Sequence, residues 1–204
     1  MRALAWHGNQ KVSVDTVPDP TIESPTDAVV RITSSAICGS DLHLYGFLGP
    51  FIDEGDILGH EPMGIVEAVG SEVTHIAAGD RVVVPFNISC GHCWTCQHQL
   101  FAQCETTQVR NKGMGASLFG FTKLYGQVPG GQAELLRVPQ AQFGPIKVPE
   151  GPSDERFPPG SPCCGASGSS ASTSCRSAWR WRGPTGSRCS TSTTTTTFPA
   201  PSGS

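Results

Sequence analysis

The chain has 204 residues, of which 37% are hydrophobic and 15% are charged, and its formal net charge is −3. The charge is unevenly divided: residues 1–155 hold all 17 acidic residues against nine basic ones, a net charge of −8, whereas residues 156–204 hold five arginines and no acid. Affinity for phosphate backbones depends on clustered Lys and Arg side chains. The acidic body therefore argues against a nucleic-acid partner.

The apolar residues are not arranged for a membrane. No run of about 18 apolar residues, the length that spans a bilayer, occurs in the chain. The N-terminal segment also lacks the apolar stretch of a signal peptide. We therefore expect a cytoplasmic location and no membrane partner.

Short segments rich in β-branched residues predict strands in the first three quarters of the chain. In chain order they are residues 2–6, 28–33, 64–69 and 81–85, and Gly and Pro turn signals separate them. Little helical periodicity accompanies them. The pattern predicts a mainly β domain over residues 1–155, folded as a partly closed barrel.

Residues 156–204 have a different composition. They contain no Leu, Ile, Val or Met, and 20 of these 49 positions are Ser or Thr. Without aliphatic residues nothing offsets the entropy of ordering the chain, so we predict a disordered tail. Two interpretations stay open: a Ser/Thr-rich regulatory linker or basic arm, and a frameshifted or mis-spliced end that begins near Phe157.

Four of the nine cysteines form a tight cluster. Cys90, Cys93, Cys96 and Cys104 stand at spacings of three, three and eight residues. Four thiolates on a short looping segment are typical of structural zinc, in which protein ligands fill all four coordination positions. An iron–sulfur cluster or four unrelated buried cysteines are the alternatives.

A second candidate metal site lies upstream. Cys38 begins the segment Cys-Gly-Ser-Asp-Leu-His, and His60 lies in Gly-His-Glu-Pro-Met-Gly. One Cys and one His from separate segments can supply two ligands of an open zinc site. Taken alone, a Cys and a His 22 residues apart are weak evidence, and a lone buried cysteine explains Cys38 better.

These motifs together carry a resemblance. The chain resembles the GroES-like N-terminal catalytic domain of zinc-dependent medium-chain alcohol dehydrogenases. The motifs that carry this resemblance follow the family's order: residues 38–43, residues 59–64, Gly-Asp-Arg-Val at 79–82 and the cysteine cluster. The resemblance covers residues 1–155. Residues 129–139 are most similar to the branch that includes the glutathione-independent formaldehyde dehydrogenases.

The resemblance implies a role for each residue of the upstream motifs. Cys38 and His60 become ligands of a catalytic zinc, and Glu61 a carboxylate that can approach the metal. Asp41 becomes the carboxylate that hydrogen-bonds to His60 and orients its ring. Ser40 would bind the alcohol oxygen, and His43 would relay its proton to solvent. The implied reaction is zinc-assisted hydride transfer from a small alcohol to NAD(P).

The resemblance stops near Phe157. The family's third zinc ligand, an Asp or a Cys, is expected shortly after residues 153–156; Asp154 lies just before that place, and Cys164 resembles it only superficially. No Gly-x-Gly-x-x-Gly motif follows residue 155. We therefore expect a dehydrogenase truncated before its Rossmann domain, with an incomplete catalytic zinc ligand set, NAD(P) bound only by the full-length family, and no activity alone.

A different class of function stays open beside the enzyme. The alternative to the enzyme is a non-catalytic zinc-binding interaction module, whose exposed apolar surface a partner would cover. A DNA-binding zinc protein is suggested by the cysteine cluster alone, and the charge of −8 over residues 1–155 argues against it. Substrate choice and oligomeric state are left open.

Overall fold

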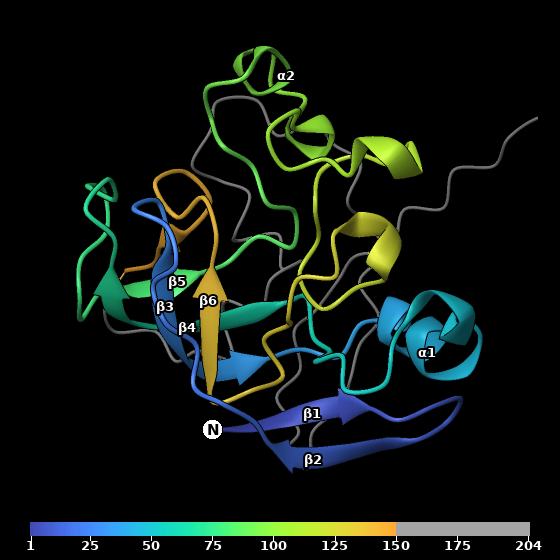
Figure 1. The fold of residues 1–204 in the computed structure, drawn as a ribbon. Coiled ribbons are helices and arrows are strands. Elements are labelled where there is room, and N and C mark those ends of the chain that lie inside the picture. The colour runs from blue at the N-terminus through green and yellow to red at the C-terminus, as the bar shows by residue number, and fades with distance from the viewer. Residues whose placement is uncertain (150–204) are drawn as a thin grey trace, which may run out of the picture. The chain divides into compact units, whose positions relative to one another are not determined.

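The computed structural model describes residues 1–149, which form two antiparallel sheets (Figure 1). The first sheet is a hairpin of β1 (Arg2–Trp6) and β2 (Val12–Thr16), in which Arg2 pairs with Thr16 and Trp6 with Val12. No helix among these residues is long and apolar enough to cross a membrane. The predicted tail, its possible third zinc ligand and the boundary at residue 155 lie outside the described residues.

The second sheet has five strands in the order β6-β3-β4-β5-β7. Its central strands are β3 (Ala28–Ser35) and β4 (Pro62–Val69), flanked by β5 (Arg81–Val83), β6 (Leu135–Val138) and β7 (Ile146–Lys147). All neighbours are antiparallel, and β6 and β7 form the two edges, so the sheet is not closed. The prediction of a mainly β fold is confirmed, and its larger sheet is open rather than closed into a barrel.

The strand boundaries differ slightly from those predicted. The strand predicted over residues 28–33 is β3, which continues two residues further to Ser35. The strand predicted over residues 64–69 is β4, which begins at Pro62. β5 ends at Val83, two residues before Pro85, which has no N–H to donate to a ladder. The strands β2, β6 and β7 were not predicted, because two of them have at most four residues and every residue of β2 is at least partly exposed.

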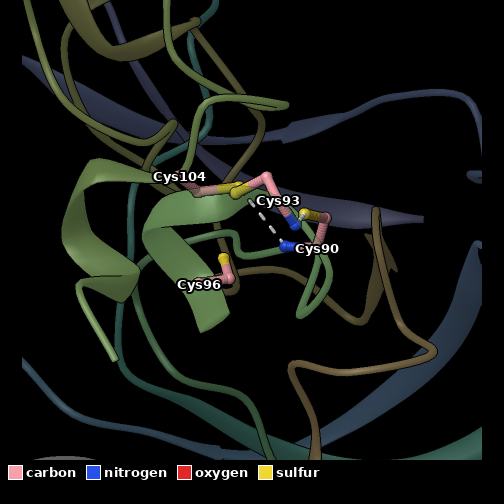
Figure 2. A group of neighbouring side chains, drawn as sticks. All are labelled: Cys90, Cys93, Cys96 and Cys104. Atoms are coloured by element: carbon pink, nitrogen blue, oxygen red, sulfur yellow. Dashed lines mark hydrogen bonds between the residues drawn. The ribbon is translucent and has the colours of Figure 1, made fainter. Parts of the chain in front are cut away.

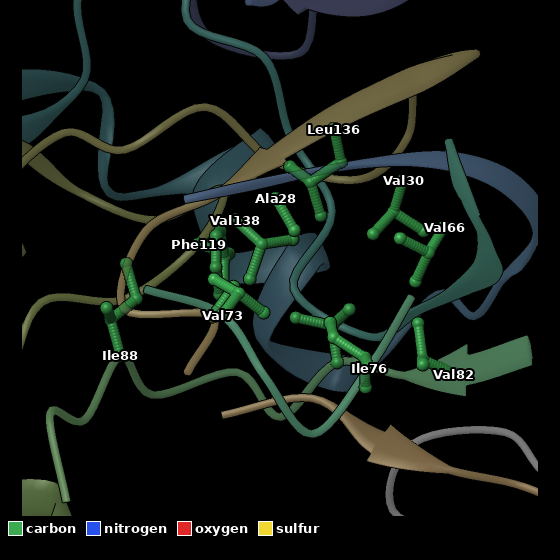
Figure 3. Packing of buried hydrophobic residues seen from close by; sticks show 12 residues of the cluster. Ala28, Val30, Val66, Val73, Ile76, Val82, Ile88, Phe119, Leu136 and Val138 are labelled. Atoms are coloured by element: carbon green, nitrogen blue, oxygen red, sulfur yellow. The ribbon is translucent and has the colours of Figure 1, made fainter. Parts of the chain in front are cut away.

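One hydrophobic cluster lies under the five-stranded sheet (Figure 3). Val30, Val66 and Val82 come from three adjacent strands and are at most 1% exposed. Phe119, from a connecting segment, is buried against the same cluster. Burying each such side chain contributes about 1.5–3 kcal/mol. The cluster therefore supports both the sheet and the connections that follow it.

Within residues 1–149, helical structure is confined to short segments. The helices are α1 (Gly39–Gly46) and α2 (Trp94–Gln97), with 3₁₀ turns η1 (Gly49–Phe51), η2 (Phe101–Gln103), η3 (Arg110–Lys112) and η4 (Lys123–Tyr125). α1 was not predicted, because only Asp41 and Leu44 are buried on it and eight residues give no periodic signal. It begins directly after Cys38, whose backbone N–H donates to the Asp41 carboxylate at 2.7 Å, satisfying a donor at the helix start.

Candidate metal centres

The four clustered cysteines converge in one lobe, residues 90–104, here called the cysteine lobe (Figure 2). Their sulfur atoms all lie within 4.8 Å of one another. Cys90, Cys96 and Cys104 are buried and Cys93 is half-buried. Cys93 precedes α2 and Cys96 lies inside it, while Cys104 follows η2. The spacing of the sequence motif therefore brings all four ligands to one point, as predicted.

Hydrogen bonds in the lobe point toward sulfur. The backbone N–H of Cys93 donates to Cys90 Sγ at 3.3 Å, and that of Cys90 donates to Cys104 Sγ at 3.4 Å. The Thr106 hydroxyl donates to Cys90 Sγ at 3.1 Å. Such donors stabilise thiolates, which are the metal-binding form of cysteine. No disulfide joins the five cysteines of the described residues.

The thiols of the lobe differ in acidity. The Thr95 hydroxyl lies 3.2 Å from Cys93 Sγ, and this hydrogen bond with neighbouring backbone donors lowers the pKa of Cys93 to about 5. Burial, and then the neighbouring Cys93 and Cys104, raise the pKa of Cys96 to about 12. Four thiolates gathered this closely repel one another unless they share a cation. The donor set fits a tetrahedral zinc ion with no open position.

Residues 142 and 143 pack against the cysteine lobe, a contact that the sequence motifs do not predict. The Phe143 ring lies 5.3 Å from that of Phe101, and a Cβ built on Gly91 would lie 2.4 Å from the Phe143 ring. The Gln142 side-chain amide donates to the Cys90 carbonyl at 3.2 Å. Gln142 and Phe143 thus pack against the segment that carries Cys90. They lie nearly 40 residues beyond Cys104, and no local motif marks them.

The second set of candidate ligands is Cys38, His60 and Glu61, here called the mixed site. Each offers one ligand atom, and these atoms lie within 4.8 Å of one another. Cys38 precedes α1, whereas His60 and Glu61 directly precede β4. The site therefore forms where the start of a helix meets the start of a central strand.

Asp41 links the two parts of the mixed site. One carboxylate oxygen accepts the Cys38 backbone N–H, and the other, Oδ1, lies 3.2 Å from His60 Nδ1. Both atoms are buried, and neither makes a hydrogen bond, so the pair is a close contact between a carboxylate and an imidazole rather than an aligned hydrogen bond. Because Nδ1 faces Asp41, Nε2 is the nitrogen left to coordinate a metal, the arrangement common in zinc sites.

The titratable groups of the mixed site influence one another. Burial alone would lower the pKa of His60, but the adjacent Asp41 carboxylate and Cys38 sulfur raise it to about 9. The Ser40 backbone N–H lowers the pKa of Cys38, and burial raises that of Glu61. A thiolate, an imidazole and a carboxylate together form a donor set that zinc accepts.

A cavity of about 240 Å³ opens onto this site. Its walls combine the three candidate ligands with Ser40 and three apolar side chains: Cys38, Ser40, His60, Glu61, Phe86, Leu118 and Phe121. No sequence motif marks the apolar wall, although Phe86 directly follows the strand predicted over residues 81–85. Unlike the cysteine lobe, the mixed site has an open side on which a small molecule can reach the ligands.

The two predicted catalytic residues lie in different surroundings. Ser40 lines the cavity, and its hydroxyl lies 3.8 Å from Cys38 Sγ. His43 is exposed on α1, its ring centroid 6.3 Å from that of Phe47, and it is not among the cavity-lining residues of the described chain. The structure thus brings Ser40, but not His43, to the ligands.

A β domain with one closed set of four thiols and one open set of mixed ligands is an arrangement typical of zinc-dependent enzymes. A family model described as "Alcohol dehydrogenase GroES-like domain" matches residues 24–150, more than half of the chain. The chain belongs to this family.

Named relatives agree. The zinc-type alcohol dehydrogenase-like protein AdhB of Bacillus subtilis is 51% identical over 151 residues, which are 74% of this chain and 39% of that protein. Glutathione-independent formaldehyde dehydrogenase of Pseudomonas aeruginosa is 37% identical over 154 residues, 72% of this chain and 37% of the relative. The chain thus spans about two fifths of the length of these relatives.

A solved structure gives the same result for the fold. Alcohol dehydrogenase TADH from Thermus sp. ATN1 superposes with a TM-score of 0.69 at 39% sequence identity, over 76% of this chain and 42% of that one. The predicted resemblance to zinc-dependent alcohol and formaldehyde dehydrogenases is confirmed at the level of the family.

Proposed function

We propose that residues 1–149 form the zinc-binding catalytic part of an NAD(P)-dependent dehydrogenase acting on a small alcohol or aldehyde, formaldehyde included. The observation that carries this proposal is the cavity of about 240 Å³ on which Cys38, His60 and Glu61 converge beside Ser40. Cys38, His60 and Glu61 would hold a zinc ion, which would supply a Lewis acid for an alcohol or carbonyl oxygen.

The residues around the cavity have separable tasks in this proposal. Phe86, Leu118 and Phe121 restrict water and favour a small, weakly polar substrate. The Ser40 hydroxyl would hydrogen-bond to the substrate oxygen, take its proton and release its own hydroxyl proton, so that Ser40 stays neutral. His43 stands three residues further along α1, the spacing that places two side chains on the same side of a helix, and it is exposed. It passes that proton to solvent.

Asp41 and the cysteine lobe have supporting roles. The Asp41 carboxylate holds the His60 ring so that Nε2 faces the cavity. The cysteine lobe holds a second zinc ion that orders residues 90–104, because metal binding and folding are coupled in such segments. The hydride acceptor is NAD(P). Its binding needs a dinucleotide domain in addition, so the 204 residues alone are expected to form no NAD(P)H from an alcohol.

Cobalt substitution tests the open site directly. Co²⁺ replaces Zn²⁺ in the purified chain, and its visible spectrum is recorded while ethanol or formaldehyde is added. The proposal predicts a change in the spectrum that disappears in C38S and persists in C96S, since only the mixed site has an open side. A spectrum that does not respond to either compound would instead favour a non-catalytic zinc-binding module.

A further inference from the structure

The position of His60 depends on a backbone contact between glycines that are distant in sequence. Gly59 directly precedes His60 and has φ +100°, a left-handed conformation that glycine adopts at no steric cost. A Cβ built on Gly120 would lie 2.5 Å from the Gly59 carbonyl oxygen and 2.6 Å from its nitrogen. The two backbones therefore touch where no side chain fits between them.

This contact is backed by hydrogen bonds from a third segment. The backbone N–H of Gly131 donates to the Gly59 carbonyl at 2.7 Å, and that of Gln132 donates to Leu58 at 2.9 Å. Gly120 in turn donates to the Val128 carbonyl at 2.9 Å. Residues 58–59, 120 and 128–132 thus form one interlocked backbone unit beside the mixed site.

The same unit carries part of the cavity wall. Leu118 and Phe121, on either side of Gly120, both line the cavity that His60 and Glu61 face. A shift of the backbone at Gly120 would therefore move a metal ligand and the apolar wall together.

We propose that Gly120 is a positioning residue of the mixed site: its missing side chain lets the segment that carries Leu118 and Phe121 pack on the backbone of Gly59, and this fixes where His60 presents its ring. The inference rests on the proposed function, because it concerns the same zinc site. In G120A the methyl group would meet backbone rather than a flexible side chain, so Gly59 or residue 120 must shift by roughly 1 Å to restore normal contact.

A matched control separates this contact from backbone strain. Gly113 also has a left-handed conformation, with φ +66° against +53° for Gly120, but a Cβ built on it meets nothing within 4 Å. G113A and G120A therefore share the strain of an alanine at positive φ, and only G120A adds the collision.

The experiment measures zinc content and the visible Co²⁺ spectrum of the full chain with Cys163, Cys164, Cys175 and Cys189 changed to serine, so that only the cysteines of the two sites can bind. We expect two zinc ions in this background and in G113A. In G120A we expect zinc binding at the mixed site to weaken by about 10- to 100-fold, as when a ligand's support is lost, with an altered Co²⁺ spectrum. The zinc of the cysteine lobe should stay.

Each other outcome decides the question. Two zinc ions bound with unchanged affinity in G120A would overturn the inference and leave the proposed function standing. Loss of both zinc ions, or of the native circular dichroism, in G120A but not in G113A would also overturn it, because Gly120 would then support the domain as a whole. A single zinc ion in the parent chain would reject the proposed function, and this inference with it.

Discussion

The cysteine lobe and the mixed site gather metal ligands in opposite ways. All four lobe ligands lie between residues 90 and 104, so a short loop brings them together. The ligands of the mixed site come from the starts of α1 and β4, and their places depend on Asp41 and on the contact between Gly59 and Gly120. When all ligands lie in one short segment, metal binding orders that segment. When they come from distant segments, the fold of the domain positions them. The two sites should therefore respond differently to the same kind of change.

Loss of a lobe ligand should have the largest effect on stability. Cys104 is fully buried, and in C104S the lobe loses its zinc and its order. We expect unfolding free energy to fall by about 4 kcal/mol or more. Thermal unfolding followed by circular dichroism measures this loss. C38S, which removes a half-buried ligand of the mixed site, is the comparison and should cost much less; equal losses would show that the two sites are not built differently.

Removing core volume should affect the mixed site selectively. Phe119 is 1% exposed and lies between two residues of the cavity wall, so F119A should cost about 3–5 kcal/mol. It should also weaken zinc binding at the mixed site and not in the lobe. L136A is the matched control, because Leu136 is equally buried in the same cluster but lies on the edge strand β6. Equal weakening by both variants would argue that overall stability, and not the neighbourhood of Phe119, governs the site.

The carboxylate of Asp41 should matter for one site only. In D41N the charge facing His60 Nδ1 is lost while the side chain keeps its shape. Zinc affinity at the mixed site should fall by about 10- to 100-fold. Competition with a chelator measures the affinity, with D53N on an exposed turn as control. An unchanged affinity in D41N would remove Asp41 from the account.

The smallest expected effect lies away from both sites. His7 has its two ring nitrogens 3.2 Å from Glu54 and 2.6 Å from Asp15, and hydrogen bonds to these carboxylates raise the pKa of His7 above its usual 6.5. The raised pKa means that this interaction stabilises the fold fully below about pH 6.5 and is lost as pH rises through the folded-state pKa. Thermal unfolding of wild type and H7Q between pH 6 and 9 should converge at the alkaline end. Zinc content should not differ between them; a zinc loss in H7Q would contradict the separation of this pair from the sites.

The sequence predicts local features of this protein well. The spacing of Cys90, Cys93, Cys96 and Cys104 is enough to predict that they converge, and runs of β-branched residues mark the central strands of the sheet. Each of these signals is contained in one short segment, where spacing alone restricts geometry.

Contacts between distant segments could not be predicted from the residues themselves. That Cys38 and His60 lie together was implied by family resemblance, since a separation of 22 residues says nothing about distance in space. Phe86, Leu118, Phe121, Gln142 and the glycine contact carry no local motif. Glycine in a connecting segment usually indicates a turn, and only the fold shows that Gly120 is pressed against another backbone.

The most direct test of two independently built sites is a count of bound zinc in the full chain, with the four cysteines beyond residue 155 changed to serine. We expect two zinc ions per chain, of which C104S removes one and C38S removes the other. One zinc ion in the parent chain, or the loss of both with C38S alone, would contradict it.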